Sequence, residues 1–225
     1  PAGRGPIGRA IDRHYLDAIG WRGIRQRKLH LEELLRLALA RLQATGRPRR
    51  ILDIAAGHGR YVLEALDGAP CQPEAILLRD FSDINVRDGR ALIASKGLDG
   101  IARFEKGDAF DQATVASAAP RPTIGIVSGL YELFPDNTMV ARSLAGLAEA
   151  IEPGGYLIYT GQPWHPQLEL IARALTSHRG GQAWVMRRRS QAEMDQLVDH
   201  AGFEKLTQRI DEWGIFTVSL ARKKT

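Results

Sequence analysis

The chain has 225 residues, of which 44% are hydrophobic, and a formal net charge of +5 at pH 7. This length suffices for one well-buried α/β domain with an appendage, and the sequence has no run of about 18 apolar residues that could cross a membrane. The single cysteine, Cys71, excludes an internal disulfide and is typical of a reducing compartment, so we expect a cytoplasmic protein. The first residue is Pro rather than Met, and we therefore expect a processed or excised piece of a longer chain.

Two amphipathic helices are expected before the first strand. Apolar residues on one face of the first helix recur four apart, at Ile7, Ile11, Tyr15 and Ile19. Gly20 is expected to end that helix, and residues 21–28 to join it to a second helix from about residue 25 to residue 44. The buried stripe of the second helix is predicted to be Leu31, Leu34, Leu35, Ala38 and Leu42. We expect the two helices to form a cap, residues 1–48, over the ligand-binding edge of a domain at residues 49–225.

Basic residues are concentrated near the start of the chain. Residues 1–50 carry 12 Lys and Arg residues against 4 Asp and Glu residues, whereas the rest of the chain has a small acidic excess. Such a concentration can attract phosphorylated metabolites, an anionic membrane surface or nucleic acid. The alternative is a solvated, arginine-rich helix surface that has no partner.

The stretch from Ile51 to Arg60 is the most informative part of the sequence. An apolar run ends at Asp53, small residues follow, and an amphipathic segment begins. This order predicts a strand, a tight turn and the N-terminus of a helix. Gly57 and Gly59 would let the backbone approach a ligand, and free N–H groups at the helix start would point towards it. Glycines at this spacing also occur where only the turn conformation needs them.

Two further apolar runs lead to acidic residues. The run 75–78 is followed by Asp80, and the run 101–106 is followed by Asp108 and Phe110. An acid at the end of the second strand can accept hydrogen bonds from both hydroxyls of a ribose. We expect the third acid and the aromatic ring at the same sheet edge, so the three segments together predict a nucleoside pocket.

These features, in this order, resemble the class I S-adenosylmethionine-dependent methyltransferases over roughly residues 50 to 222. The resemblance implies an α/β fold with a Rossmann-like, seven-stranded, mostly parallel sheet and an antiparallel last strand, to which the N-terminal helical cap is added. It implies S-adenosyl-L-methionine as cofactor, with its methionine part at the first loop, its ribose on Asp80 and its adenine beside Asp108 and Phe110. The cofactor-binding candidates are Asp53, Ala55, Gly57, Gly59, Asp80, Phe81, Asp108, Ala109, Phe110 and Ser128.

Two positions of the first loop bear on this interpretation. Ala55 stands where many relatives have glycine, which is acceptable if its φ is negative. The competing interpretation is an NAD-type dinucleotide fold, whose pattern has a third glycine three residues after the second. That position is Val62, which argues against an NAD-type dinucleotide fold.

The pattern continues after the third strand. A fourth strand is predicted at residues 123–128, and Asp136 or Asn137 can cap the helix that follows. A Pro-Gly-Gly turn then leads into a fifth strand at residues 156–160.

The last part of the chain is expected to form a helix and a hairpin. Ser190 and Glu193 have the spacing of a capping box at the start of a helix over residues 191–201. The runs 203–210 and 215–220 are separated by a link short enough for a hairpin. A hairpin here forces one antiparallel strand into an otherwise parallel sheet, which is typical of these methyltransferases.

The loops after the fourth and fifth strands supply the catalytic candidates. In the fold that the resemblance implies, this edge faces the methyl group, so Tyr131, Glu132 and His165 are expected to contact the acceptor. Glu132 could be a general base, and His165 could take a proton near neutral pH. The alternatives are a capping or surface role for Glu132 and a capping role for His165. The run at residues 187–189 could bind a phosphate, but a solvated arginine run before a helix cap is the favoured interpretation.

Other chemistries lack the residues that they need. Amino methylation of nucleic-acid bases usually shows a polar residue followed by Pro-Pro and an aromatic residue after the fourth strand, whereas Ser-Gly-Leu-Tyr stands at residues 128–131. Carbon methylation through a thiolate needs a cysteine in that loop or the next, and Cys71 precedes the second strand. The His and Cys residues show no paired ligand spacing, so we expect no metal.

Three phrases of the sequence, at residues 9–17, 20–28 and 128–134, resemble a group of bacterial methyltransferases. Members of that group often form the C-terminal part of a chain whose N-terminal part is an α/β-hydrolase, and some are linked to phospholipid metabolism. The favoured function is methyl transfer to a small or lipid-related, anionic acceptor. The alternatives are an RNA methyltransferase and a cofactor-binding regulatory subunit that has no chemistry of its own.

Overall fold

A computed structural model describes residues 3–176, 181 and 183–225 of the chain. Seven strands form one sheet: β1 Arg50–Asp53, β2 Ala75–Asp80, β3 Ala102–Lys106, β4 Ile124–Val127, β5 Tyr156–Gly161, β6 Phe203–Ile210 and β7 Thr217–Lys223. Their order across the sheet is β3-β2-β1-β4-β5-β7-β6. The first five strands are parallel, and β7 is antiparallel to both β5 and β6. The predicted sheet is therefore confirmed, with its antiparallel strand placed one position inside the edge.

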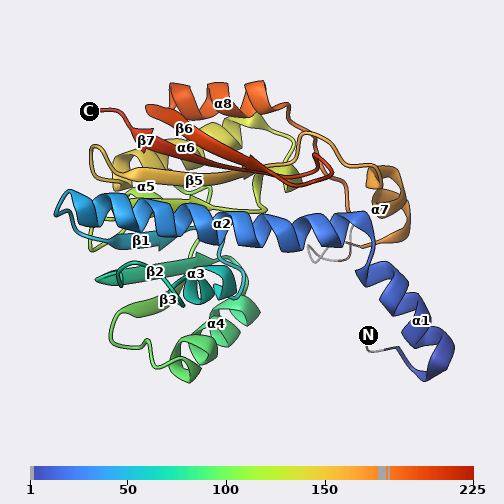
Figure 1. Cartoon of the computed structure of the whole chain (residues 1–225). Helices are drawn as coiled ribbons and strands as arrows, with labels where there is room; N and C mark the ends of the chain where they lie inside the picture. Colours follow the sequence, from blue (N-terminus) through green and yellow to red (C-terminus); the bar gives the residue numbers. More distant parts are fainter. Residues whose placement is uncertain (1–2, 177–180, 182) are drawn as a thin grey trace.

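Helices cover both faces of this sheet (Figure 1). They are α1 Gly5–Leu16, α2 Ile19–Ala44, α3 Arg60–Ala65, α4 Asp83–Ser95, α5 Gln112–Ala116, α6 Asn137–Ala150, α7 Leu168–Ala174 and α8 Gln191–His200, with a short 3-10 helix, η1, at Tyr131–Leu133. None of the described helices is long and apolar enough to cross a membrane.

The alternation of side chains along each strand creates two hydrophobic layers. On one face, apolar residues of α2, α3 and α4 pack with strand residues such as Ile51, Ile76 and Ile158. On the other face, α5, α6 and α8 pack with the intervening strand residues, such as Leu52 and Leu157. This three-layer arrangement leaves the carboxyl ends of β1 to β5 free to build a site.

Helix α2 is longer than the sequence predicts. It begins at Ile19, so the stretch 21–28 is its first part and not a connection, and Gly20 lies inside it. The glycines are explained by packing, because a Cβ at Gly20 would lie 2.7 Å from Nε2 of His165 and one at Gly23 would lie 2.9 Å from the Phe216 ring. The missing side chains allow α2 to approach residues that follow β5 and precede β7, and this contact offsets the low helix propensity of glycine.

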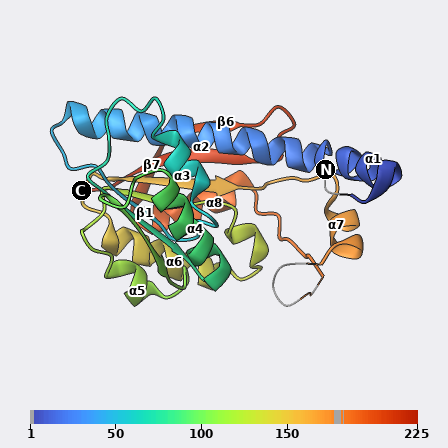
Figure 2. The ribbon, with the colours of Figure 1, turned by 90° about the horizontal axis from the view of Figure 1, so that it is seen from below.

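The second half of α2 belongs to the main core. The predicted stripe of Leu31, Leu34, Leu35, Ala38 and Leu42 is buried in the same cluster as the strands. The helix therefore runs from the core to a region beyond the strand ends, where Figures 1 and 2 both place α1 and α7. The boundary between a cap at residues 1–48 and a domain at residues 49–225 stays a prediction.

Most basic residues among the first fifty of the chain are engaged within the chain. Arg22 and Arg27 lie over the rings of Trp213 and Phe216, and the others contact carboxylates or backbone carbonyls. The residues with such carboxylate or carbonyl partners are Arg25, Lys28, Arg36, Arg47, Arg49 and Arg50. On α1, by contrast, Arg9 and Arg13 are exposed, as is the preceding Arg4. The N-terminal charge is thus largely structural outside α1.

Two predicted helix caps are confirmed. The Asp136 carboxylate accepts a hydrogen bond from the backbone N–H of Thr138 at 2.8 Å at the start of α6. Ser190 accepts one from the N–H of Glu193 at 3.1 Å at the start of α8. Both caps satisfy donors that a helix N-terminus otherwise leaves unpaired, and they fix the positions at which the chain leaves the loops near the strand ends.

Candidate functional site

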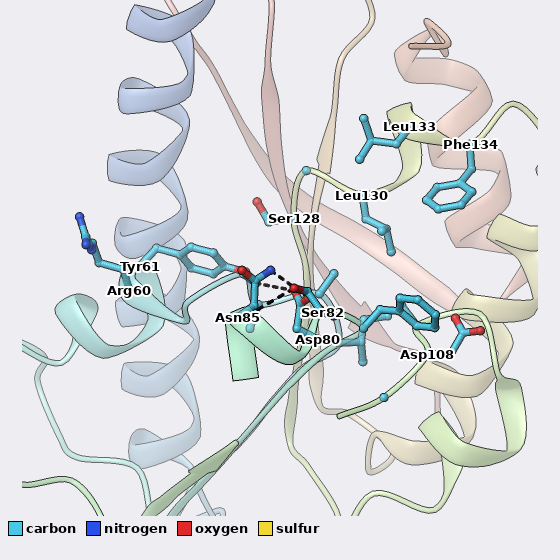
Figure 3. Close-up of a pocket in the computed structure, with 18 of the residues that line it drawn as sticks. Arg60, Tyr61, Asp80, Ser82, Asn85, Asp108, Ser128, Leu130, Leu133 and Phe134 are labelled. Atoms are coloured by element: carbon cyan, nitrogen blue, oxygen red, sulfur yellow. Dashed lines mark hydrogen bonds between the residues drawn. The ribbon is translucent and has the colours of Figure 1, made fainter. Parts of the chain in front are cut away.

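A cavity of about 1160 Å³ lies where the carboxyl ends of β1, β2, β3 and β4 meet, beside the first half of α2. Figure 3 shows Arg60 and Tyr61 on the α2 side of this cavity and Leu130, Leu133 and Phe134 on the opposite side. Asp80 lies between these two groups. The parallel strands thus bring polar groups from separate parts of the sequence to one edge.

The first loop, residues 54–59 between β1 and α3, is held in place by Asp53. This carboxyl is fully buried and accepts hydrogen bonds from the N–H of Ala55, at 3.2 Å, and from the hydroxyl of Tyr61. Burial is the largest influence on its pKa, which it raises to about 7. Asp53 does not line the cavity, so it acts as a support for the loop.

The two glycines of this loop have different roles. Gly57 has a φ of 58° and lines the cavity, and a Cβ at this position would meet no protein atom within 4 Å. Gly59 has a φ of 72° and does not line the cavity, and a Cβ there would lie 2.3 Å from Cδ1 of Leu78. Gly57 therefore leaves room for a ligand, whereas Gly59 serves the turn and its packing on β2. The positive-φ residues are all glycines among the described residues, so the alanine at position 55 fits its place.

Asp80 connects the first loop to the start of α4. One carboxylate oxygen accepts the N–H of Gly57 at 2.9 Å, and the other accepts the N–H of Ser82 at 2.9 Å and the side-chain amide of Asn85 at 3.0 Å (Figure 3). The side chain lines the cavity while these bonds fix its orientation. Asp80 is therefore a preorganised carboxylate. Its four acceptor sites exceed the three donors already bound, so it can accept a further hydrogen bond from a ligand.

A carboxylate and two rings shape the far end of the cavity. Asp108 accepts the N–H of Phe110 at 2.9 Å, and the Phe110 and Phe134 rings meet edge to face with centroids 4.4 Å apart. Ala109 and Ser128 also line this cavity, and so does Phe81, whose side chain is 72% exposed. A flat apolar ring system would find both packing surface and a hydrogen-bond acceptor here.

The structure brings together most of the predicted cofactor-binding residues. Those that line the first cavity are Ala55, Gly57, Asp80, Phe81, Asp108, Ala109, Phe110 and Ser128. Sequence reasoning missed Ile24, Arg27 and Lys28 of α2, as well as Arg60 and Asn85. The missed α2 residues fall in the stretch that was expected to be a connection, where the helical periodicity of the apolar residues is interrupted by glycines.

A second cavity of about 370 Å³ adjoins the first. It lies between the beginning of α2, α7 and the residues that follow β5. The two cavities share part of their lining, namely Ile24, Arg27, Gly129 and Leu133. A molecule in the second cavity would therefore lie next to a molecule in the first.

Two of the predicted catalytic residues line the second cavity. The Glu132 carboxylate is 8% exposed and lies 3.4 Å from Nη1 of Arg27. His165 is 6% exposed, and its Nδ1 accepts the N–H of Gln167 at 3.1 Å. Burial lowers the pKa of His165, partly offset by the charge of Asp211, so the ring is neutral at pH 7. Because Nδ1 is an acceptor, the neutral ring carries its proton on Nε2 and is a hydrogen-bond donor there.

The third catalytic candidate, Tyr131, points elsewhere. Its hydroxyl donates to Ser143 at 2.9 Å within the buried layer below α6, and its side chain lines neither cavity. Burial raises the pKa of Tyr131 above its usual range. The one-residue difference between Tyr131 and Glu132 reverses the direction of the side chain because η1 begins at this point.

Two of the three arginines in the run before α8, Arg187 and Arg189, are structural and not solvated as predicted, whereas Arg188 is exposed. Arg189 is buried and donates to the carbonyls of Tyr131, at 2.6 Å, and Phe134, at 2.7 Å, and to the side chain of Asn137. Arg187 donates to the Pro135 carbonyl and to the same asparagine. These contacts fasten the loop that carries Glu132 to the start of α6.

The elevated pKa of Asp53 leads to a testable pH dependence. The folded state holds this proton more tightly than the unfolded state, so the free energy of unfolding of wild-type protein should fall between about pH 4 and pH 7 and stay lower above that range. Asp53→Asn should lack this loss, on the order of 2–3 kcal/mol, because the amide is never charged. Urea unfolding of both proteins without cofactor at about pH 5 and pH 8 measures the difference. Equal pH dependences would contradict the prediction.

Solved structures of low sequence identity share this fold. A Bordetella parapertussis protein described as a possible exported protein is 20% identical, with a TM-score of 0.77 over 100% of this chain and 75% of that chain. A protein from Methanosarcina mazei described as a SAM-dependent methyltransferase is 20% identical, with a TM-score of 0.59 over 79% of this chain and 93% of that chain. The predicted fold of S-adenosylmethionine-dependent methyltransferases is thereby confirmed.

A relative of higher identity is a protein from Escherichia coli (strain K12), YnbC, described as uncharacterized, which is 61% identical over 224 residues. The alignment covers 100% of this chain and 38% of that protein, so the chain spans well under half the length of this relative. The family described as Putative methyltransferase matches residues 1–223. This match confirms the predicted methyltransferase class, and the chain belongs to that family.

Proposed function

We propose that the chain binds S-adenosylmethionine in the first cavity and transfers its methyl group to a small molecule in the second. The observation that carries this proposal is the contact between the two cavities at Gly129, Leu133 and Arg27. A donor and an acceptor in adjoining cavities would lie next to each other, and a direct transfer requires such proximity of the reacting groups.

The residues of the first cavity fit the cofactor. Gly57 leaves open space for close approach of its methionine part, and the neighbouring cations Arg60 and Lys28 suit the carboxylate of that part. Asp80 can accept a ribose hydroxyl, and the Phe110 region suits the adenine. When bound, the cofactor supplies a methyl group on a positively charged sulfur, which is a good leaving group.

The protein then has to orient the acceptor and receive its proton. Glu132 is the proposed proton acceptor, since it is the carboxylate that lines the second cavity among the described residues. Arg27, 3.4 Å away, holds this carboxylate in its orientation. His165 is proposed to donate a hydrogen bond from Nε2, which corrects the expectation that it takes a proton. Tyr131 is proposed only to support the loop.

The finer expectations about the acceptor have unequal support. The apolar lining of the second cavity supports a small or lipid-related acceptor. The anionic part of the expectation, and an anionic membrane surface as partner, rest on Arg4, Arg9 and Arg13, which line neither cavity. An RNA acceptor rests on the same charges and is not favoured by any part of the described site. A regulatory subunit without chemistry would not need a second cavity with a carboxylate.

Two expectations concern the whole protein. The length of the Escherichia coli relative supports the proposal that this chain is part of a longer protein, and a hydrolase domain in the remaining part stays a prediction from the resemblance. A cytoplasmic location stays a prediction from the single cysteine.

A comparison of variants tests the proposed function. Cell extracts incubated with the protein and S-adenosylmethionine should yield a small molecule with a mass gain of about 14 daltons. Glu132→Gln should lower the rate about a hundredfold, because the amide cannot take a proton, while the affinity for S-adenosylhomocysteine stays within twofold. Glu204→Gln, on the exposed edge strand β6, is the matched control and should leave both unchanged.

Two results would contradict the proposal. One is full turnover of the true acceptor by Glu132→Gln. The other is cofactor binding by wild type without a mass gain in any extract fraction, which would favour the regulatory subunit. A mass gain confined to RNA would favour the RNA methyltransferase.

A further inference from the structure

The wall of the second cavity is mainly apolar and aromatic. It includes Trp21 of α2, Leu170 and Ile171 of α7, and two residues from later in the chain, Trp184 and Phe216. Contact with such a wall stabilises a ligand because apolar surface is removed from water. A volume of about 370 Å³ is at the small end of the usual range for ligand sites. The cavity therefore suits a compact molecule with an apolar body.

The charges at the cavity do not favour an anion. Arg27 is the one Lys or Arg residue in its lining among the described residues, and it is already paired with Glu132 at 3.4 Å. The Arg27 guanidinium also lies over the Phe216 ring, 4.8 Å from the ring centre. An anionic ligand would have to draw Arg27 away and leave the buried Glu132 carboxylate unpaired, which is costly.

Glu132 and His165 provide one acceptor and one donor among the polar groups of the cavity, whose lining also includes Tyr15, Gln162 and Gln167. The Glu132 carboxylate, which is paired with Arg27, is an acceptor, and Nε2 of His165 is a donor because Nδ1 already accepts the N–H of Gln167. A Cβ at Gly20 of α2 would lie 2.7 Å from Nε2, so this atom lies on the α2 side of the cavity, whose lining includes Gly20. A group that both donates and accepts hydrogen bonds matches this pair, and a hydroxyl is the simplest such group.

We propose that the second cavity binds the methyl acceptor as an uncharged, compact molecule with an aromatic or other apolar body and a hydroxyl group that meets Glu132. This inference rests on the proposed function and specifies its acceptor. In the transfer, the hydroxyl oxygen forms the new bond to the methyl carbon, and the methyl–sulfur bond breaks with its electron pair going to sulfur. The hydroxyl proton passes to the Glu132 carboxylate, and the products are a methyl ether and S-adenosylhomocysteine.

Three probes with the same apolar body test the proposal. Protein loaded with S-adenosylhomocysteine is titrated with 4-propylphenol, 4-propylaniline and 4-propylbenzoate, and binding is followed by calorimetry. The phenol should bind at least tenfold more tightly than the benzoate, because the benzoate carries the charge that the cavity disfavours. The aniline should bind more weakly than the phenol, since it is a poorer acceptor for the Nε2 proton.

A pair of variants places the probe in the cavity. Ala174→Phe at the end of α7 puts a ring into the lining and should weaken phenol binding at least tenfold. Ala172→Phe, two positions earlier on the same helix and outside the lining, is the matched control and should not. Both variants should bind S-adenosylhomocysteine as wild type does, which shows that they are folded.

The outcomes separate this inference from the proposed function. Failure of wild-type protein to bind S-adenosylhomocysteine would overturn the proposed function itself. Normal binding of that product, combined with equal or tighter binding of the benzoate or with phenol binding that Ala174→Phe leaves unchanged, would overturn only the inference about the acceptor.

Discussion

Asp80→Asn is expected to lower the affinity for S-adenosylmethionine about a hundredfold to a thousandfold. Two losses combine. The first is a charge-assisted hydrogen bond to the cofactor, which contributes about 1.5–3 kcal/mol. The second is local, because both carboxylate oxygens accept backbone N–H groups, those of Gly57 and Ser82. The amide of asparagine has one oxygen, so it can accept only one of these two N–H groups. Its NH₂ group then faces the other N–H, and this contact between two donors destabilises the first loop.

Calorimetric titration with S-adenosylmethionine measures this effect. Asp83→Asn is the matched control, since Asp83 is three positions further on, pairs with Lys106 at the surface and does not line the first cavity. The control should bind as wild type does. An affinity of Asp80→Asn within threefold of wild type, in a protein that melts normally, would mean that the cofactor is not held at this carboxylate.

Arg189→Met is expected to lower the free energy of unfolding by about 3–5 kcal/mol. The guanidinium satisfies the carbonyls of Tyr131 and Phe134 and the side-chain oxygen of Asn137. Each hydrogen bond to a charged group contributes about 1.5–3 kcal/mol. The sum is reduced by relaxation of the loop and by the donors that remain, namely the Phe134 N–H at the Tyr131 carbonyl and Arg187 at Asn137. The methionine replaces most of the volume of arginine, so the loss reports the hydrogen bonds more than a cavity.

The neighbouring residue provides a strict comparison. Arg188 is exposed and adjoins Arg189 in the sequence, so Arg188→Met removes the same charge and should change the free energy of unfolding by less than about 0.5 kcal/mol. Urea unfolding curves measure the change in the free energy of unfolding for both variants. Similar losses in both would show that net charge, and not the contacts to the loop after β4, governs this stability.

The central strands β1, β2, β4 and β5 could be predicted because they are buried on both faces. Ile51 and Leu52, for example, pack into opposite hydrophobic layers, so the sequence there is a continuous apolar run. The strand ends follow from the acids and glycines that interrupt such runs. The cofactor side of the site depends on these ends, which is why residues such as Asp80 and Asp108 could be identified in the sequence.

The surroundings of the second cavity could not be predicted in the same way, because tertiary contacts determine them. Gly20 and Gly23 weaken the helical pattern locally, and only their contacts with His165 and Phe216 explain why the helix continues through them. The direction of Tyr131 depends on Ser143 of α6, and the burial of Arg189 depends on carbonyl groups more than fifty positions earlier. Short-range patterns carry no information about such partners.

The position of β7 determines when the edge of the sheet can form during synthesis. Strand β6 is made before β7, yet in the described sheet it pairs with β7 alone, and β7 in turn pairs with β5. As the nascent chain emerges, β6 has no strand to join until β7 has left the ribosome. Five parallel strands can assemble first, and the exposed edge of β5 remains open to incorrect pairing until β7 closes it. A ribosome that stalls between residues 211 and 217 would therefore hold a chain whose β6 residues are complete but unpaired.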